Sequence, residues 1–408
     1  MRLLKLLSIF LVPVTSSPPS LEVPQQQHLS SQRQNHERLL PGSGSTSGGG
    51  GVSPTFFASL ERTARLVDIT YCVGTTGISP PFSCASRCKD FPSLHLIRTW
   101  NTGVLLSDSC GYIAVDHGVG EKAIIVAFRG TYSISNTIVD LSTVPQEYVP
   151  YPAPGDGNGD GDEGGDGRRR CENCTVHMGF MASWRNAREA VLPALKAARE
   201  AHPGYSVHLI GHSLGGAVAA LAALELTLSL GWGDVMITTF GEPRVGNKQL
   251  AEYIDRAFGL SNEEDQRDTE GLSYRRVTHA GDPVPLLPLT EWGYRSHAGE
   301  VYIEKSDLPP EPEDLRLCHG DDDPACIGGA ETAGWLRWVV GLLTGKATPD
   351  DDETLKISRN WFPARLKLWQ LLFAHRDYFW RLGLCLPGGD PADWGRGRCD
   401  GQSELRDL

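Results

Sequence analysis

Apolar residues recur at helical spacing in the segment FFASLERTARLVDITYC, which begins at Phe56. Leu60, Ala64 and Val67 follow Phe57 by three, seven and ten residues, so the four side chains fall on one face of a helix. The residues before position 53 show no such period. We therefore expect a folded domain over residues 53–400 that begins with this helix, packed by its apolar face against a core.

Short runs rich in β-branched residues predict the strands of that domain. They are AIIVAF (123–128), SVHLI (206–210), VMITTF (235–240), YRRVTH (274–279) and EVYI (300–303). A helical stretch, ASWRNAREAVLPALKAAREAH, precedes the second run, and another, AVAALAALELTLSL, separates the second from the third. This alternation of strands and helices predicts an α/β fold with a mostly parallel central sheet flanked by helices.

The amino-terminal pattern is that of a secretory signal peptide. Two early cations precede an apolar stretch from Leu6 to Val14, and small polar residues follow, so we assign residues 1–16 to the signal. Residues 17–52 are rich in Ser, Pro, Gln and Gly, a composition that predicts a disordered leader, and residues 401–408 form a tail. No other stretch reaches the roughly 18 apolar residues of a transmembrane segment.

Composition narrows the range of partners. The chain has 408 residues, of which 40% are hydrophobic, enough for a sizeable core. Its 38 Lys and Arg against 50 Asp and Glu give a formal net charge of −12, which argues against a nucleic-acid-binding surface. A neutral or apolar partner fits better.

An acidic, Gly-rich segment occupies residues 153–170. Asp156, Asn158, Asp160 and Gly161 match the first half of a calcium-binding loop, but the twelfth position, where a bidentate Glu is needed, is Gly167. We therefore expect a solvated surface loop without a metal ion.

The ten cysteines of a chain that enters the secretory pathway predict disulfides. CENC, at residues 171–174, has the spacing of a zinc or redox pair, but no second CxxC accompanies it. We expect a short-loop disulfide there and no structural metal.

The stretch HLIGHSLGGAVAAL places Ser213 at the corner between a predicted strand and a predicted helix. GHSLG fits G-x-S-x-G, and Gly211 and Gly215 leave room for the tight turn that projects a serine hydroxyl outward. The helix that starts at Leu214 directs its free N–H groups toward the place where an oxyanion would form. Ser213 is therefore a candidate nucleophile, the alternative being an idle serine in a turn.

A serine nucleophile needs a histidine to take its proton and an acid to orient that histidine. Asp282, in RVTHAGDPVPLLP, follows a predicted strand and suits the acid. His279 lies only three residues from Asp282, His297 leads into a strand, and His375 lies in the aromatic-rich LWQLLFAHRDYFW. From the residues alone, the choice of base between His375 and His297 stays open.

Seven motifs between Phe56 and Cys385 resemble, in order, those of the fungal class 3 lipases, secreted α/β-hydrolases that cleave triacylglycerols. They are AFRGTYSISNTIVDL, VHMGF, GHSLGGA, FGEPRVGN, RVTHAGDPVPLLP, EWGYRSHAGEVYI and AHRDYF. The resemblance implies a triad of Ser213, Asp282 and His375 acting through an acyl-enzyme, with no cofactor.

The resemblance also implies an oxyanion hole formed by the backbone N–H groups of Thr131 and Leu214. The segment after Thr131 would be a short lid helix, in which Ile134, Ile138 and Leu141 recur on one apolar face. Such a lid opens at a lipid–water interface. The alternative is a surface helix that stays packed on the core.

By the same resemblance, Cys72 pairs with Cys385, and the local pairs Cys84–Cys88 and Cys171–Cys174 form. We add Cys318–Cys326 because the two are close in sequence, and Cys110–Cys399 by elimination. Extra sequence at about 305–360, which includes WLRWVVGLL, has three interpretations: a second cap, a lipid contact or ordinary packing.

The sequence thus predicts a secreted triacylglycerol lipase. A feruloyl or short-chain esterase, or a phospholipase, would use the same residues. A lipid carrier without catalysis is the remaining alternative, and the presence of all three triad candidates argues against it.

Overall fold

The structure is a computed structural model that describes residues 51–103, 108–118, 122–131, 141, 148–150, 171–260, 271–319, 323–332 and 373–386. The signal peptide, residues 17–50 of the leader, the Gly-rich segment up to residue 170, residues 333–360 of the extra sequence and the tail lie outside these ranges. None of the helices in the described part is long and apolar enough to cross a membrane.

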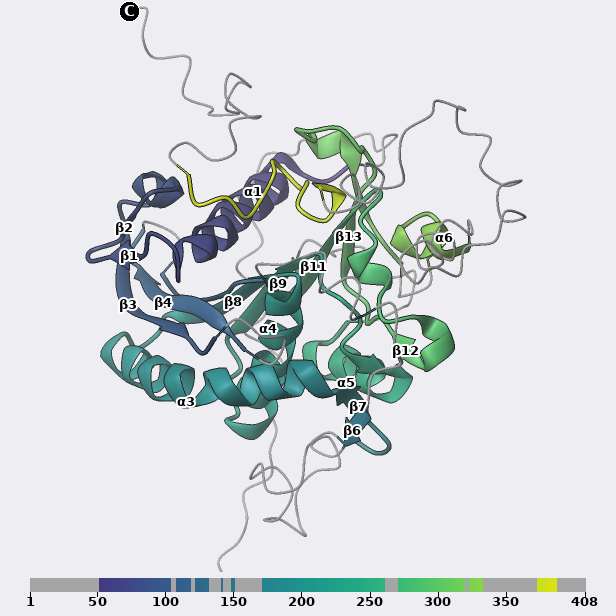
Figure 1. Ribbon diagram of the computed structural model, residues 1–408, viewed down its shortest axis with the longest axis horizontal. Coiled ribbons are helices and arrows are strands. Elements are labelled where there is room, and N and C mark those ends of the chain that lie inside the picture. Colours follow the sequence, from purple (N-terminus) through teal and green to yellow (C-terminus); the bar gives the residue numbers. More distant parts are fainter. Residues whose placement is uncertain are drawn as a thin grey trace, which may run out of the picture. The chain divides into compact units, whose positions relative to one another are not determined.

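An eight-stranded sheet runs through the domain in the order β14-β13-β11-β9-β8-β5-β4-β3 (Figure 1). The five strands from β13 to β5 are parallel, whereas β14 at one edge and β4 and β3 at the other run antiparallel to their neighbours. The bounds are β3 (Leu94–Asn101), β4 (Cys110–Asp116), β5 (Ala123–Phe128), β8 (Ser206–His212), β9 (Val235–Phe240), β11 (Tyr274–His279), β13 (Glu300–Ile303) and β14 (Leu315–Leu317). The mostly parallel α/β fold is confirmed.

Burial explains which strands the sequence revealed. All six residues of β5 are buried, because the centre of a parallel sheet is covered on both faces, and the strand is therefore a continuous apolar run. β5, β9, β11 and β13 have the predicted bounds, and β8 continues to His212. The antiparallel strands β3 and β4 were not predicted: in β3 only Leu94 and Trp100 are buried, and β4, although buried throughout, contains Gly111 and Asp116 and is not a continuous apolar run.

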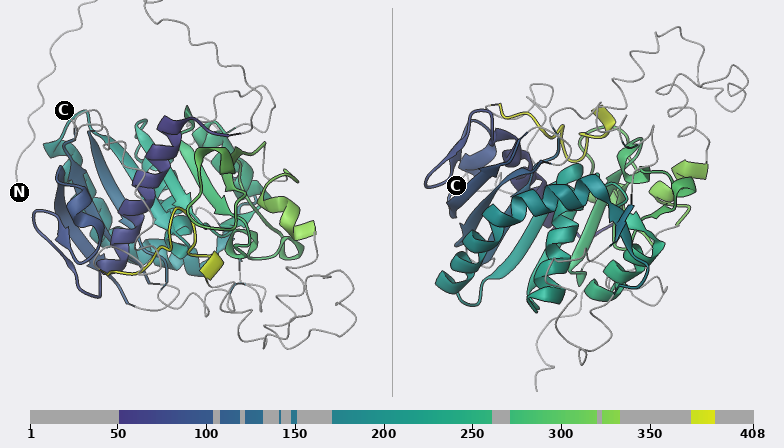
Figure 2. Two further views of the ribbon diagram at one scale, coloured as in Figure 1. Left: turned by 90° about the horizontal axis from the view of Figure 1, so that it is seen from above. Right: turned by 60° about the horizontal axis from the view of Figure 1, so that its bottom comes forward.

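The helices form a layer on each face of the sheet (Figure 1). One face packs against α1 (Pro54–Ile69) and the carboxyl-terminal segment 373–386, which Figure 2 shows side by side. The other face packs against α3 (Met178–Ala201), α4 (Leu214–Leu224) and α5 (Lys248–Phe258). Every residue of α4 is buried, which its run of alanine, glycine and leucine permits.

Local signals fix the helix ends. Ser53 accepts a hydrogen bond from the Phe56 amide at 3.1 Å, and Pro54 occupies the first helical position of α1. Helix α5, which the sequence analysis did not predict, is capped by Asn247 and ends at Gly259 with φ 65°.

Smaller elements complete the described part. A four-stranded antiparallel sheet has the order β12-β10-β7-β6, and a hairpin joins β1 to β2. The bounds are β1 (Ile78–Ser79), β2 (Ser83–Cys84), β6 (Tyr148–Pro150), β7 (Thr175–His177), β10 (Gly246–Asn247), β12 (Tyr294–Arg295), α6 (Ile327–Thr332), the π-helical turn η4 (Glu225–Ser229) and the 3₁₀ turns η1 (Thr70–Cys72), η2 (Arg87–Asp90), η6 (Val284–Leu286), η7 (Thr290–Trp292) and η8 (Pro312–Asp314).

Two predicted boundaries change. Gly51 and Val52 were assigned to the disordered leader, but the Val52 amide donates to the Pro312 carbonyl at 3.1 Å and its side chain is buried. The first part of the extra sequence is also built into the core sheet, since Leu315–Leu317 pairs with β13. Packing is thus the correct interpretation for the described start of that segment.

Four of the five expected disulfides are present: Cys72–Cys385, Cys84–Cys88, Cys171–Cys174 and Cys318–Cys326. The Cys110–Cys399 pairing is wrong, because Cys110 is a free thiol at the start of β4. Its sulfur is enclosed in the core, 3.6 Å from the Val73 carbonyl, and burial raises its pKa to about 11. Cys399 lies outside the described residues.

Helix α1 holds the carboxyl-terminal segment through a buried carboxylate. Asp68 accepts a hydrogen bond from the Gly383 amide at 2.8 Å and lies 3.4 Å from the Arg87 guanidinium. Burial raises the pKa of Asp68 to about 6, against the opposing effect of the Gly383 amide, Arg87, Arg376 and Ser86. The folded protein therefore binds a proton at Asp68 more tightly than the unfolded chain does.

This difference predicts how stability changes with pH. Between the unfolded pKa of 3.8 and the folded pKa of about 6, the native state holds the extra proton, so Asp68 makes the free energy of unfolding rise as the pH falls from 7 to 4. The contribution reaches about 3 kcal/mol. Asp68→Asn should flatten this part of the pH profile, measured by urea unfolding from pH 4 to 8. Asp90→Asn, which leaves Asp68 intact, is the control, and identical slopes for Asp68→Asn and wild type would contradict the prediction.

Candidate active site

The candidate residues lie where parallel strands end. Ser213 follows β8, Thr131 comes three residues after β5, and Asp282 comes three residues after β11. Because the carboxyl ends of parallel strands meet at one edge of a sheet, side chains from distant parts of the chain come together there.

The Ser213 backbone is strained. Its backbone has φ 58° and ψ −131°. Residues other than glycine rarely adopt a positive φ. The Ser213 amide donates to the Phe240 carbonyl at the end of β9 over 2.9 Å. A β-carbon at Gly211 would collide with the Gly215 carbonyl, and one at Gly215 would collide with the Phe128 carbonyl. Gly211 is therefore required for β8 and α4 to meet at this turn, and Gly215 is required for α4 to pack against the end of β5.

His375 is bound to Asp282. Its Nδ1 lies 3.0 Å from each carboxylate oxygen, and both side chains are fully buried. The Asp282 carboxylate also accepts a hydrogen bond from the Tyr378 hydroxyl at 2.6 Å and one from the Val284 amide at 2.9 Å. Because a carboxylate only accepts, Nδ1 carries the proton, and Nε2 is the basic nitrogen of the neutral ring.

His375 lies beside the Ser213 turn. The imidazole of His212, which precedes Ser213, stacks on that of His375 with ring centroids 4.6 Å apart. Phe240, whose carbonyl accepts from the Ser213 amide, is followed by Gly241. Gly241 lies against the His375 ring, since a β-carbon added there would be 2.8 Å from His375 Cε1. Ser213 Oγ and His375 Nε2 are both buried, and neither has a hydrogen-bond partner among the described residues. No hydrogen bond therefore joins these two atoms to each other, and both can bond to a substrate.

The expected oxyanion residues flank the same turn. A β-carbon at Gly130 would lie 2.9 Å from Ser213 Cβ, so the residue that follows, Thr131, leaves β5 next to the nucleophile. Leu214 is the first residue of α4, so its N–H belongs to the unsatisfied amino-terminal turn of the helix. The Thr131 hydroxyl is buried and has no partner in the described part of the chain.

Of the expected lid residues, Ile134 and Ile138 lie outside the described residues. Leu141 is fully buried in the core on the α3, α4 and α5 side of the sheet.

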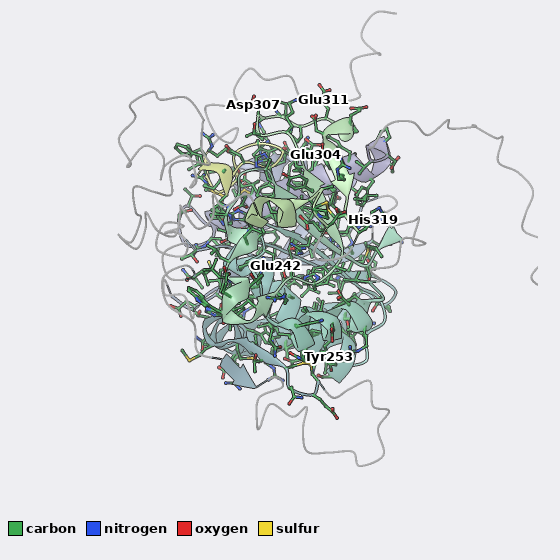
Figure 3. All side chains as sticks on the ribbon, turned by 90° about the vertical axis from the view of Figure 1, so that its right-hand side faces the viewer. Glu242, Tyr253, Glu304, Asp307, Glu311 and His319 are labelled. Atoms are coloured by element: carbon green, nitrogen blue, oxygen red, sulfur yellow. A yellow bond between two sulfur atoms is a disulfide. The ribbon has the colours of Figure 1, made fainter. Side chains whose placement is uncertain are left out.

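The alternative base, His297, is engaged elsewhere. Its Nε2 lies 3.2 Å from Glu242 Oε1 and its Nδ1 lies 2.7 Å from the Ala298 carbonyl, so both nitrogens face acceptors. Figure 3 shows Glu242 inside the molecule, away from Glu304, Asp307 and Glu311. His279 faces the Lys305 carbonyl through Nε2 at 2.9 Å. Of the three candidates, it is His375 that the structure places on Asp282.

Three further residues at the site were missed by the sequence analysis. Tyr378 follows His375 by three residues in AHRDYF, His212 is the first of the two variable positions of GHSLG, and Tyr71 is the penultimate residue of the first helical stretch. Only the motif position of His212 could have drawn attention, since nothing in the sequence shows which hydroxyl reaches which ring.

Comparison with known proteins identifies the family of the chain. Residues 125–292 match the family described as lipase (class 3). The chain is 60% identical over 362 residues to secreted mono- and diacylglycerol lipase 2 of Gibberella zeae, covering 86% of this chain and 87% of the relative. It is 57% identical over 372 residues to lipase A of Sodiomyces alcalophilus, covering 86% and 88%.

A solved structure shows the same fold. The Lip2 lipase of Yarrowia lipolytica superposes with a TM-score of 0.63 at 28% identity, over 83% of this chain and 98% of that one. With identities near 60% over most of two lipases, and with this shared architecture, the chain belongs to the class 3 lipase family of carboxylic ester hydrolases.

Proposed function

We propose that this protein is a secreted acylglycerol lipase in which Ser213 is the nucleophile, His375 the base and Asp282 the acid. The observation that carries the proposal is the fully buried His375–Asp282 pair beside the strained Ser213 turn. Such a turn costs about 1–3 kcal/mol and persists where the surrounding packing enforces it.

The reaction follows from the atoms in place. His375 Nε2 takes the Ser213 Oγ proton as the oxygen attacks the ester carbonyl, and Asp282 stabilises the imidazolium that forms. The tetrahedral intermediate then expels the alcohol, which receives the proton from Nε2. Water, activated by the same nitrogen, hydrolyses the acyl-enzyme and regenerates Ser213.

The negative charge of the intermediate would be bound by the N–H groups of Thr131 and Leu214. Each such donor contributes roughly 3 kcal/mol of transition-state stabilisation. The unpartnered hydroxyl of Thr131 supplies a further donor at the same place.

The substrate class follows from two relatives and from the surface. Two relatives, 60% and 33% identical to this chain, are named mono- and diacylglycerol lipases. Partial glycerides are therefore the first substrates to test, beside triacylglycerols. Phe373 and Leu386, at either end of the segment that carries His375, expose 37% and 40% of their surface. Phe373 lies two residues before His375, so an exposed apolar side chain lies close in sequence to the proposed base.

The role of Ser213 gives a first prediction. Ser213→Ala should lower kcat on emulsified monoacyl-, diacyl- and triacylglycerols by about 10⁵-fold or more, because no other nucleophile serves the base. Titration of released fatty acid measures the rate, with melting temperature as the control for folding. Hydrolysis that survives in the purified variant would refute the proposal. A p-nitrophenyl ester series that peaks at two to four carbons would instead indicate a short-chain esterase.

The Thr131 hydroxyl gives a second prediction. Thr131→Val keeps the shape and the backbone N–H but removes the hydroxyl donor, so kcat should fall by about 10²-fold with little change in KM. Thr131→Ser retains the donor and is the matched control. Equal rates for the Val and Ser variants would show that the hydroxyl takes no part.

Tyr378 gives a third prediction. Tyr378→Phe removes a donor from Asp282, so the carboxylate attracts the His375 imidazolium more strongly, and the acid limb of the kcat/KM profile should move to higher pH. Tyr274→Phe is the control, because the Tyr274 hydroxyl donates to Glu242 over 2.8 Å in another buried cluster. Both variants should lose about 1.5–3 kcal/mol of stability. Only Tyr378→Phe should move the profile, and an unmoved acid limb would contradict the assignment.

A further inference from the structure

His212 makes three contacts with residues around the triad. Its Nε2 lies 2.8 Å from the main-chain carbonyl of His375, and its Nδ1 lies 2.5 Å from the Tyr71 hydroxyl. Its ring stacks on the His375 ring, 4.6 Å between centroids and 29° between planes. The side chain is fully buried.

These partners fix the tautomer of His212. A carbonyl oxygen only accepts, so Nε2 carries a proton and donates it to His375. Burial lowers the pKa of His212 well below its usual value, and His375 and Arg376 lower it further. The ring is therefore neutral, and Nδ1 accepts a hydrogen bond from Tyr71.

Tyr71 anchors this pair to the rest of the site. It lies in η1 at the end of α1, and Cys72 beside it forms the disulfide with Cys385. A β-carbon at Gly130 would lie 2.7 Å from the Tyr71 hydroxyl oxygen, so Tyr71 also contacts the strand end that leads to Thr131. Tyr71 and His212 together contact the segments that carry the oxyanion residue, the nucleophile and the base.

We infer that His212 is a positioning residue for ester hydrolysis, a neutral link that holds the main chain and the ring plane of His375 against Tyr71. The inference rests on the proposed roles of Ser213 and His375. Two of its contacts act on the base separately: the hydrogen bond fixes where the His375 backbone lies, and the stacked ring fixes how its imidazole is turned.

The neutrality of His212 matters during the reaction. His375 becomes an imidazolium when it takes the Ser213 proton, and a second cation stacked at 4.6 Å would oppose that step. The other groups around His212 are Tyr71, the Tyr378 ring at 6.0 Å and the Arg376 guanidinium, and Asp282 binds the far side of His375. A neutral aromatic ring at this face supports the cation.

The experiment separates the two contacts by substitution. His212→Phe keeps a stacked ring but removes the donor to the His375 carbonyl, and His212→Gln keeps a donor but removes the ring. Each should lower kcat by about tenfold to a hundredfold with KM changed less than about threefold, because a misplaced base affects the chemical step more than binding. The acid limb of the kcat/KM profile should also move relative to wild type.

Active-site titration with an organophosphonate normalises every rate to the folded, reactive enzyme, so that a loss of stability alone does not lower kcat. His208→Gln is the matched control, because His208 lies on the same strand β8 and bonds to Thr238 at 3.0 Å instead of to the site. It should lose stability while its kcat and pH profile stay those of wild type.

Tyr71→Phe provides a second route if the His212 variants do not fold. It leaves His212 in place but removes its anchor, and kcat should fall by about threefold to tenfold. In the double variant with His212→Phe, the two losses should be less than additive, because the residues act in series.

Rates per titrated site within twofold of wild type, with unmoved pH profiles, would overturn the inference. That outcome differs from failure of the proposed function, which Ser213→Ala reports independently. A pH profile shifted equally by His208→Gln would also overturn the inference, since the effect would then be general to the strand.

Discussion

The active site depends on one backbone conformation, the left-handed turn at Ser213. Strand β8 and helix α4 meet there at an angle that leaves no room for side chains at Gly211 and Gly215. The turn is held from three sides, by the Phe240 carbonyl of β9, by the end of β5 and by the packing of α4, all of whose residues are buried. The strain is local, and its cost is met by the core around it.

His375 reaches this turn on a segment that has almost no regular structure. Residues 373–386 are placed by contacts to α1: the Asp68–Gly383 hydrogen bond, the Cys72–Cys385 disulfide and the edge-to-face pair Phe57–Phe379. Helix α1 thus acts as a scaffold for catalysis even though it supplies no reacting group. Tyr71 lies in η1, directly after the same helix, so one stretch of chain supports both the His375 segment and the Ser213 turn.

The sequence predicted the parts of this arrangement that depend on residues close together in the chain. Short runs rich in β-branched residues located the five parallel strands, and GHSLG located Ser213 because the motif requires a strand before it and a helix after it. Pattern alone left His297 and His375 as equal candidates, since both lie beside plausible segments. The contacts that separate them, Glu242 for His297 and Asp282 for His375, join residues 55 and 93 positions apart. Cys110 was misassigned for a similar reason: counting cysteines does not reveal that one of them is enclosed in the sheet.

The disulfide between Cys72 and Cys385 spans 313 positions and lies next to the segment that carries the base. During synthesis, the nucleophile turn leaves the ribosome more than 150 residues before His375 does, as their numbers show. His375 therefore comes to lie beside the Ser213 turn only when the carboxyl-terminal segment has packed against α1.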